Sequence, residues 1–254
     1  MLRKGRRRMV VACNMLMRVG QIPVKHGLAV WRALVRPVLE YGCEVWWEEA
    51  DQVWGEAEAV QIEMLKRILR CGPRIPNDVV LGEMGVLPLR VRRDMLRLGF
   101  WTKILSYSDK TWVKRLYNEG RRRFIVGQEK NWSSFTHSLL QKYGCLEDWD
   151  SDEFDPDLKD RMRAKVWEVA ERDWQARISL KSSLSDYKSW KSSLKLEKYL
   201  LKNERHFETD FGRRHLIRFR AGVSVDTGRW ERSVSGKGLE RASRKCLMCY
   251  AGRG

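Results

Sequence analysis

The chain has 254 residues, of which 33% are charged, and its formal net charge is +17. A chain of this length can bury the core of one or two domains. It contains no apolar run near the ~18–20 residues of a membrane-spanning helix, so we expect no membrane among its partners. The excess of positive charge attracts polyanions and therefore predicts RNA, DNA or both as partners. An anionic membrane surface is the second polyanion considered, and the missing apolar run disfavours it.

The N-terminal segment carries the first basic cluster. All charges between residues 3 and 36 are positive. A short apolar run follows the cluster, as in signal and transit peptides, but Arg18 closes that run early and no small-residue cleavage site follows. We therefore expect an intracellular protein of the nucleus or cytoplasm, with a mitochondrial location as the alternative. The cluster comprises Arg3, Lys4, Arg6, Arg7 and Arg8.

Residues 28–47 predict a kinked core helix. Apolar residues recur there every three or four positions, which would line one helix face. Pro37 lacks an N–H and crowds the preceding turn, so the helix should kink or restart near Arg36. An aromatic anchor, Trp46 and Trp47, then precedes a run of acids. The apolar positions are Leu28, Trp31, Leu34, Val35, Val38 and Leu39.

Two further helices are expected before residue 106. Asp51 can cap the first, which residues 71–73 (CGP) should end. Pro88 suits the first turn of the second. Its helical spacing turns Val91, Met95, Leu98 and Leu105 inward, and leaves Arg90, Arg92, Arg93 and Arg97 for water or phosphate.

The pattern of the middle region is helical as well. Asp109 can cap a helix, Gly144 should close another, and Asp155-Pro156 should start a third. The acidic segment 147–157 is expected to separate two lobes. One lysine-rich helix is expected over residues 186–201. Each predicted helix has a stripe of apolar residues that should face inward. The stripes are Trp112, Val113, Leu116 and Tyr117 in the first helix, Trp132, Phe135, Leu139 and Tyr143 in the second, and Tyr187, Trp190, Leu194 and Leu201 in the lysine-rich helix.

Together these patterns predict an all-α fold in three parts. Residues 1–106 would form a helical bundle, and residues 107–205 a helical connector with an acidic linker near 147–157. Residues 206–254 would form the third part, a partly disordered basic tail, because the chain turns polar and glycine-rich beyond Gly222.

Three short stretches carry a resemblance to a known family. They are Lys25 with residues 35–46 (VRPVLEYGCEVW), residues 81–85 (LGEMG) with Pro88-Leu89 and Arg93, and residues 216–222 (LIRFRAG) followed by 246–249 (CLMC). In this order they resemble the region after the catalytic core of non-LTR (LINE-type) retrotransposon reverse transcriptases. The last stretch is similar to the basic helix and the opening half of the C-terminal zinc knuckle of that family, which implies a basic helix and a truncated zinc knuckle within residues 206–254. No motif of the family matches roughly residues 106–205.

The resemblance implies a function for each part. Residues 1–106 would be thumb-like helices that grip the template and primer duplex, and the tail would hold the element's RNA or target DNA in a ribonucleoprotein. The missing partner would be an upstream catalytic domain. In that family the polymerase carboxylates come from an aromatic-Ala-Asp-Asp box, because two metal ions must be held on the reacting oxygens. This chain has no Asp-Asp pair, so we expect no enzymatic activity from it alone.

A nuclease is the competing enzymatic interpretation. Pro156-Asp157 and Asp186-Tyr187-Lys188 imitate elements of metal-dependent restriction-like nucleases. Those carboxylates normally lie on adjoining strands, whereas both elements here begin predicted helices. The pattern therefore disfavours a nuclease.

Cys246 and Cys249 have the spacing of a zinc hairpin, because two thiolates so close in sequence can bind one tetrahedral ion. Four ligands are needed, and the histidine and further cysteine that follow in the resembled family are absent from this chain. We expect an unfilled half-site, with zinc bound only if ligands come from outside this chain. The four scattered cysteines, Cys13, Cys43, Cys71 and Cys145, are expected to be reduced core residues.

Two more basic clusters complete the predicted nucleic-acid-binding surface. One is Arg121, Arg122 and Arg123, and the other is Arg213, Arg214, Arg218 and Arg220, interleaved with Phe211, Phe219 and Trp230. Guanidinium groups can bind phosphate while aromatic rings stack on unpaired bases. Two alternatives stay open: a helical adaptor for acidic proteins, and an organellar RNA-binding protein unrelated to polymerases.

Overall fold

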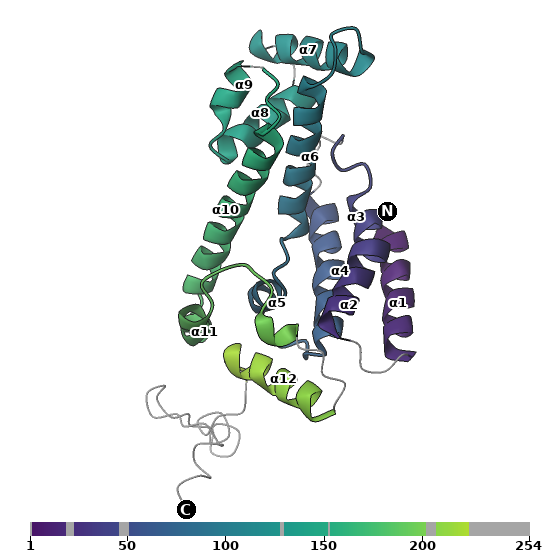
Figure 1. The fold of residues 1–254 in the computed structure, drawn as a ribbon, viewed down its shortest axis with the longest axis vertical. Coiled ribbons are helices and arrows are strands. Elements are labelled where there is room, and N and C mark those ends of the chain that lie inside the picture. Colours follow the sequence, from purple (N-terminus) through teal and green to yellow (C-terminus); the bar gives the residue numbers. More distant parts are fainter. Residues whose placement is uncertain are drawn as a thin grey trace, which may run out of the picture.

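The computed structural model describes residues 2–18, 23–45, 51–127, 130–151, 153–201 and 207–223. Within these residues every regular element is a helix and there is no strand, so the predicted all-α class is confirmed. The predicted disordered tail falls mainly on residues 224–254, outside the described part. Figure 1 shows an elongated arrangement, with α1 to α4 packed side by side.

The helices follow one another with short connections. Their bounds are α1 Leu2–Arg18, α2 Val24–Val30, α3 Arg36–Glu40, α4 Asp51–Leu69, α5 Asn77–Met84, α6 Leu89–Leu105, α7 Trp112–Ile125, α8 Trp132–Lys142, α9 Leu146–Ser151, α10 Leu158–Ser179, α11 Ser185–Trp190 and α12 Phe207–Arg220. A π-helical turn, η1 (Trp31–Val35), joins α2 to α3, and two short 3₁₀ turns are η2 (Ser182–Leu184) and η3 (Lys198–Leu200).

Pro37 produces the predicted restart. Because its nitrogen carries no hydrogen, it cannot continue the α-helical ladder. The Arg36 N–H instead bonds the carbonyl of Trp31, five residues earlier, and the turn widens into a π-helix just before α3. Trp31, Val35 and Leu39 nevertheless all reach the core.

Two helix boundaries depend on residues that local patterns do not reveal. Helix α4 ends at Leu69, because the next residue, Arg70, has a left-handed φ of 51°, and the N–H of Cys71 bonds the carbonyl of Lys66. Helix α6 begins after Pro88, which has no side-chain cap. The Glu58 carboxylate of α4 accepts the Leu89 N–H at 2.7 Å and takes the place of that cap.

The buried apolar residues form two clusters. The first lies between α1 to α5 and is completed by side chains from the end of α10 to α12, including Trp174, Tyr187 and Ile217. The second lies between α6 and α10 and is centred on Trp101 and Trp149, whose rings stack at 6.3 Å. Trp149 belongs to the acidic segment and is buried in this cluster, whereas Glu147, Asp150 and Ser151 around it are exposed. The role of residues 147–157 as a linker between two lobes stays a prediction.

Helices α6 and α10 connect the two clusters. They run side by side in opposite directions, with α7 to α9 at one end and α5, α11 and α12 at the other (Figure 1). Residues 9–89 and 170–221 supply the first cluster, and residues 98–166 supply the second. Clusters of packed side chains do not by themselves define domains, so the boundaries at 106 and 205 stay predictions.

Two arginines that the sequence assigned to water or phosphate are buried. Arg93 and Arg97 of α6 are only 3% and 0% exposed. The Arg97 guanidinium lies 4.3 Å from the centre of the Phe135 ring and donates to the carbonyl of Cys43 at 3.5 Å. Position 97 faces α8 and the turn after α3, which a single-helix pattern cannot show, so the outward assignment of both residues was wrong.

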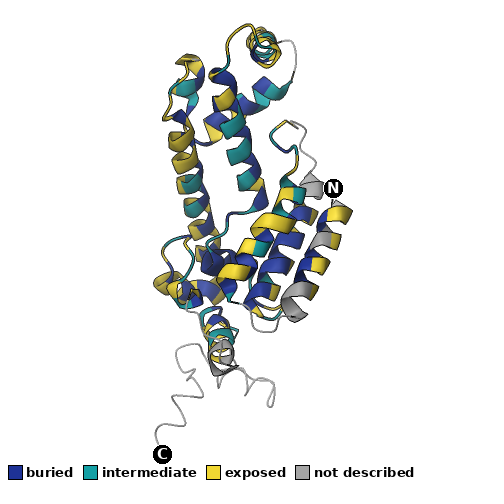
Figure 2. Ribbon diagram, turned by 45° about the vertical axis from the view of Figure 1, so that its right-hand side comes forward, coloured by how far each residue is buried: buried dark blue, intermediate teal, exposed yellow. Residues whose placement is uncertain are grey.

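The predicted inward stripe of α7 was also wrong, because most of its apolar residues are exposed. Only Tyr117 of that stripe is buried, whereas Trp112 and Leu116 are 74% and 70% exposed. The cap is Thr111 rather than Asp109, because its side chain accepts the Lys114 N–H. Figure 2 shows exposed positions along α7.

The predicted lysine-rich helix over 186–201 was also wrong. Helix α11 stops at Trp190, and residues 191–197 form a loop that leads to η3. Tyr187 and Leu194 are buried as expected, but Trp190 and Leu201 are half exposed. Glu171 of α10 accepts the Leu194 N–H at 2.6 Å, and this tertiary contact replaces the bond that a continuing helix would make.

Candidate nucleic-acid interface

Helix α12 is attached to the rest of the protein through one side. Ile217 is buried in the first cluster, and Ala221, in the turn after the helix, is buried beside it. Arg220, one turn from Ile217, donates through Nε to the Glu83 carboxylate of α5 at 2.9 Å. The predicted binding residue Arg220 is therefore engaged inside the protein, and its guanidinium also lies 3.8 Å from Glu197.

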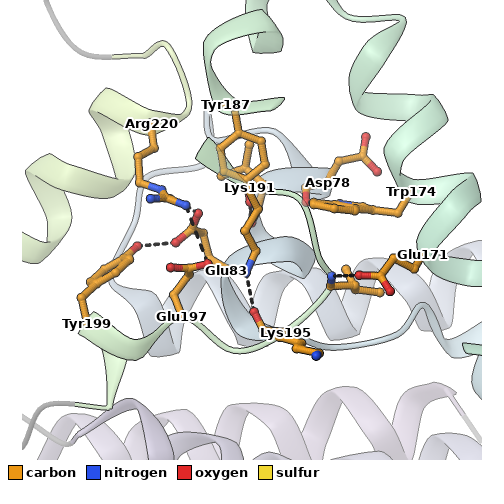
Figure 3. Close-up of polar contacts among 12 residues, drawn as sticks. Asp78, Glu83, Glu171, Trp174, Tyr187, Lys191, Lys195, Glu197, Tyr199 and Arg220 are labelled. Carbon is orange, nitrogen blue, oxygen red and sulfur yellow. Dashed lines mark hydrogen bonds and ion pairs between the residues drawn. The ribbon is translucent and has the colours of Figure 1, made fainter. Parts of the chain in front are cut away.

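Glu83 is the centre of this attachment, as Figure 3 shows. Its side chain is fully buried, and it accepts hydrogen bonds from Arg220 and from the Tyr199 hydroxyl. Burial and the Glu83 carboxylate raise the pKa values of Tyr199 and Tyr187, so both phenols stay protonated. A buried carboxylate that is paired with an arginine and hydrogen-bonded by tyrosine stabilises a defined position of α12.

The loop 191–197 is held in the same network. The Lys191 ammonium is buried, pairs with Glu197 and donates to the carbonyl of Lys195. The Glu197 N–H donates to the backbone carbonyl of Glu83 at 3.0 Å. Gly85 ends α5 with a φ of 57°, and the loop passes so close that a Cβ there would lie 2.2 Å from the Leu196 nitrogen. The loop therefore fixes α12 against α5.

The opposite side of α12 is exposed and basic. Arg218, His215, Leu216 and Phe219 are exposed, and Arg213 and Arg214 are half buried. The sequence from 211 to 223 contains no Asp or Glu. Phe219 stacks on Trp190 of α11, with ring centres 5.4 Å apart and planes at 14°. Side chains of the described residues thus combine positive charge with aromatic surface on this side.

The second predicted cluster, on α7, is engaged in local contacts. Arg121 donates to the carbonyl of Trp149 at 2.9 Å and lies over its ring. Arg122 and Arg123 both donate to the carboxylate of Glu119. These hydrogen bonds lower the pKa of Glu119 to about 2, so the carboxylate stays charged beside them. Glu119 therefore offsets part of the positive charge that a phosphate would meet there.

The first predicted cluster lies on α1. Arg3, Lys4 and Arg7 are exposed, while the side chains of Arg6 and Arg8 are outside the described residues. The structure does not bring all the clusters together, because α7 and α12 lie at opposite ends of the molecule (Figure 1). The ring beside Arg121 in the α7 cluster, Trp149, is buried, whereas the α12 cluster has the exposed rings of Trp190 and Phe219 beside its arginines.

The predicted zinc half-site, Cys246 and Cys249, and the predicted ring of Trp230 lie outside the described residues. Within the described part, no group of three or more His, Cys, Asp or Glu side chains could hold a metal ion. Cys13, Cys43 and Cys145 are buried free thiols, which confirms their expected core positions, whereas Cys71 is only partly buried against the first cluster. None of the described helices is both long and apolar enough to cross a bilayer.

Trp190 is the residue of this face that sequence analysis missed, because the pattern placed it inside a continuous helix. One signal could have found it. The tetrapeptide Lys-Ser-Ser-Leu occurs at 181–184 and again at 191–194, and both leucines are buried while both lysines pair with acids. Two anchored copies ten residues apart bracket α11 and leave its last residue, Trp190, at the surface.

Comparisons with protein-family models, with curated proteins and with solved structures found no match to this chain.

Proposed function

We propose that this chain binds nucleic acid through the outer face of α12. The observation that carries the proposal is the pairing of an exposed Arg218 with the exposed Phe219–Trp190 stack, in a segment without acids. Arginine binds phosphate oxygens through charge-assisted hydrogen bonds, and aromatic rings bind bases. The net charge of +17 adds attraction for polyanions over longer distances.

Binding of this kind tolerates different sequences. Phosphates carry no base identity, so contacts from arginine position a nucleic acid without selecting its sequence. Each phosphate that the protein neutralises releases counterions, and affinity therefore falls steeply as salt rises. The proposal assigns binding to this chain and leaves any polymerase chemistry to a separate catalytic domain.

The experiment is a salt titration with a short labelled RNA, offered as a single strand and as a duplex. We expect binding at low salt that weakens steeply toward moderate salt. Arg218→Gln should weaken binding and reduce the salt slope by about 1. Arg122→Gln is the matched control, because that exposed arginine already pairs with Glu119. Absence of binding at low salt to either RNA, or a flat salt response, contradicts the proposal.

The resemblance to LINE-type reverse transcriptases extends the proposal. Under it, the chain is the region after the catalytic core, it grips the template and primer duplex, and it acts in a ribonucleoprotein of the nucleus or cytoplasm. The genomic reading frame tests this part. Upstream sequence should encode the aromatic-Ala-Asp-Asp box, and downstream sequence should encode the histidine and cysteine that Cys246 and Cys249 lack. A frame with neither contradicts the assignment.

A helical adaptor is the second candidate, because α7 favours a protein partner. Its exposed Trp112 and Leu116 lie one helical turn apart, with Arg115 over the Trp112 ring at 4.8 Å. Exposed apolar side chains beside basic ones suit an amphipathic acidic segment. A pull-down that survives nuclease treatment and is lost in Trp112→Ala supports the adaptor. Capture that disappears with nuclease supports nucleic-acid binding instead.

A further inference from the structure

The Trp190–Phe219 stack lies at the surface, unlike the other aromatic pair near it. Trp174 and Tyr187 meet edge to face inside the first cluster, and both are fully buried. Trp190 and Phe219 are each 45% exposed, although their rings are nearly parallel. A stack formed only to bury apolar area would cover more of both rings.

Both rings are held by buried neighbours. Tyr187, one turn before Trp190 on α11, is fully buried, and Ile217 and Arg220 anchor α12 on either side of Phe219. A ligand that contacts these rings does not have to order them first, so binding costs little conformational entropy.

Helical geometry places positive charge next to the stack. Arg218 precedes Phe219, so its Cα is about one residue rise, ~1.5 Å along the axis, from that of Phe219. Arg214 is one turn before Arg218 and lies along the same edge of the helix. A phosphate chain that follows this edge keeps its bases within reach of the Phe219 ring.

We infer that the Trp190–Phe219 stack is a platform for unpaired bases, so that the nucleic acid this face binds is single-stranded. This inference rests on the function proposed above and specifies its ligand. In a duplex, each base has both faces covered by its neighbours, and a protein ring cannot stack on it without unstacking the helix. An unpaired base offers an open face, and stacking on aromatic side chains accepts any base.

The experiment compares three probes of equal length that carry the same label. They are a single-stranded oligonucleotide of mixed sequence, the same strand annealed to its complement, and a strand in which every nucleotide is abasic. The abasic strand keeps every phosphate and lacks only the bases. We expect the intact protein to bind the single strand more tightly than either other probe at the same salt concentration.

Variants of the two rings separate stacking from charge. Phe219→Ala should weaken single-strand binding by roughly 5- to 100-fold, since stacking contributes on that scale per base, and should leave binding of the abasic strand unchanged. Trp190→Ala should act in the same direction, and Phe219→Trp should retain binding. Leu216→Ala is the control, because Leu216 is an exposed apolar residue of α12 without a ring. Circular dichroism should show the same helix content in all four variants.

The outcomes distinguish this inference from the broader proposal. If the protein binds the duplex or the abasic strand as tightly as the single strand, the stacking platform is overturned and salt-dependent nucleic-acid binding stands. The same holds if Phe219→Ala and Leu216→Ala bind alike. If the intact protein binds none of the probes at low salt, both the platform and the proposed function fail.

Discussion

Glu83 is a fully buried carboxylate whose charge is met by a single arginine from a distant part of the chain. Its hydrogen bonds from Arg220 and Tyr199 join α5, η3 and α12 (Figure 3). Buried ion pairs contribute modestly when intact, but removal of one partner leaves a desolvated charge that nothing compensates. The cost of a substitution here therefore depends on which charge is left behind.

Glu83→Gln should lower the free energy of unfolding by about 3–5 kcal/mol, because Arg220 then keeps a half-buried charge without its main counter-ion. Urea unfolding followed by circular dichroism measures the change. Glu63→Gln is the matched control, since that exposed carboxylate pairs with Arg67 at 2.6 Å and should change stability by at most about 0.5 kcal/mol. A double variant, Glu83→Gln with Arg220→Met, should recover part of the loss, and equal effects in E83Q and E63Q would contradict the assignment.

Burial also controls the chemistry of the free thiols. It raises the pKa of Cys43 to about 12 and that of Cys71 to about 11, with nearby acids adding to the effect at Cys43. A thiol is alkylated as the thiolate, and at a slightly basic pH the thiolate fraction of both cysteines is very small in the folded protein. Unfolding removes the burial and returns each pKa to its ordinary range.

We therefore expect Cys43 to resist iodoacetamide at mildly basic pH in the folded protein and to react rapidly in urea. Cys71 of the folded protein, which is partly buried, should react faster than folded Cys43 and more slowly than Cys43 in urea. Because the thiolate fraction grows as pH rises toward the pKa, alkylation of Cys71 should accelerate before that of Cys43. Peptide mass spectrometry measures both sites in one sample. Rapid labelling of folded Cys43 would show that it is not buried as described.

At the scale of elements, Gly85 connects α5 to the loop that holds α12. A side chain there meets two obstacles: the left-handed backbone, with φ at 57°, and the Leu196 backbone 2.2 Å from the position of a Cβ. The left-handed conformation alone costs a non-glycine residue about 1–2 kcal/mol. The contact adds to this cost, because a backbone segment cannot move aside as a flexible side chain can.

Gly85→Ala should lower the free energy of unfolding by more than about 1 kcal/mol and shift the 191–197 loop. Gly99→Ala should instead raise the free energy of unfolding. Gly99 lies within α6 with no atom within 4 Å of a Cβ, so alanine there should stabilise the protein by up to about 1 kcal/mol. Thermal unfolding of the two variants, measured in parallel, tests the pair. A Gly85→Ala protein as stable as wild type would rule out the close approach of the loop.

At the scale of the whole molecule, the first cluster is discontinuous in sequence. Trp174, Tyr187 and Ile217 fill a core whose other residues come from α1 to α5. A fragment of residues 1–106, the predicted thumb-like unit, lacks these side chains and keeps the apolar surface that they cover.

We expect the 1–106 fragment to be helical but loosely packed, with binding of a hydrophobic dye and without a cooperative thermal transition. A chain of residues 1–223 should unfold in one transition, because α6 and α10 join the two clusters. Calorimetry of the two chains measures this. A cooperative transition in the shorter chain would support the predicted boundary at 106.

Features that depend on local backbone interactions could be predicted from the sequence, whereas features that depend on contacts between distant elements could not. The restart at Pro37 and the helix end at Gly144, whose φ is 69°, depend on local backbone chemistry and were predicted. The burial of Arg97 and the exposure of Trp112 depend on which elements lie opposite, and helical periodicity describes one helix at a time.

In the candidate site too, some residues could be predicted from the sequence and others depend on contacts with distant parts of the chain. A basic helix at the position of α12 was implied by the resemblance, and the binding roles of Arg218 and Phe219, which are exposed, were predicted from the alternation of arginines and aromatic residues. The inward role of Arg220 was not, since Glu83 lies far away in the chain, and neither was the surface position of Trp190. These two residues determine how the face is anchored and what it offers to a base.

The bond between Arg220 and Glu83 also sets an order of assembly on the ribosome. Helix α5 leaves the exit tunnel long before Arg220 has been translated. Until then the Glu83 carboxylate lacks the arginine with which it pairs in the folded protein. A nascent chain that stalls anywhere earlier therefore exposes an unfinished core, which chaperones and proteases recognise. Only polypeptides translated through α12 contain both the buried Glu83–Arg220 pair and the surface proposed to bind nucleic acid.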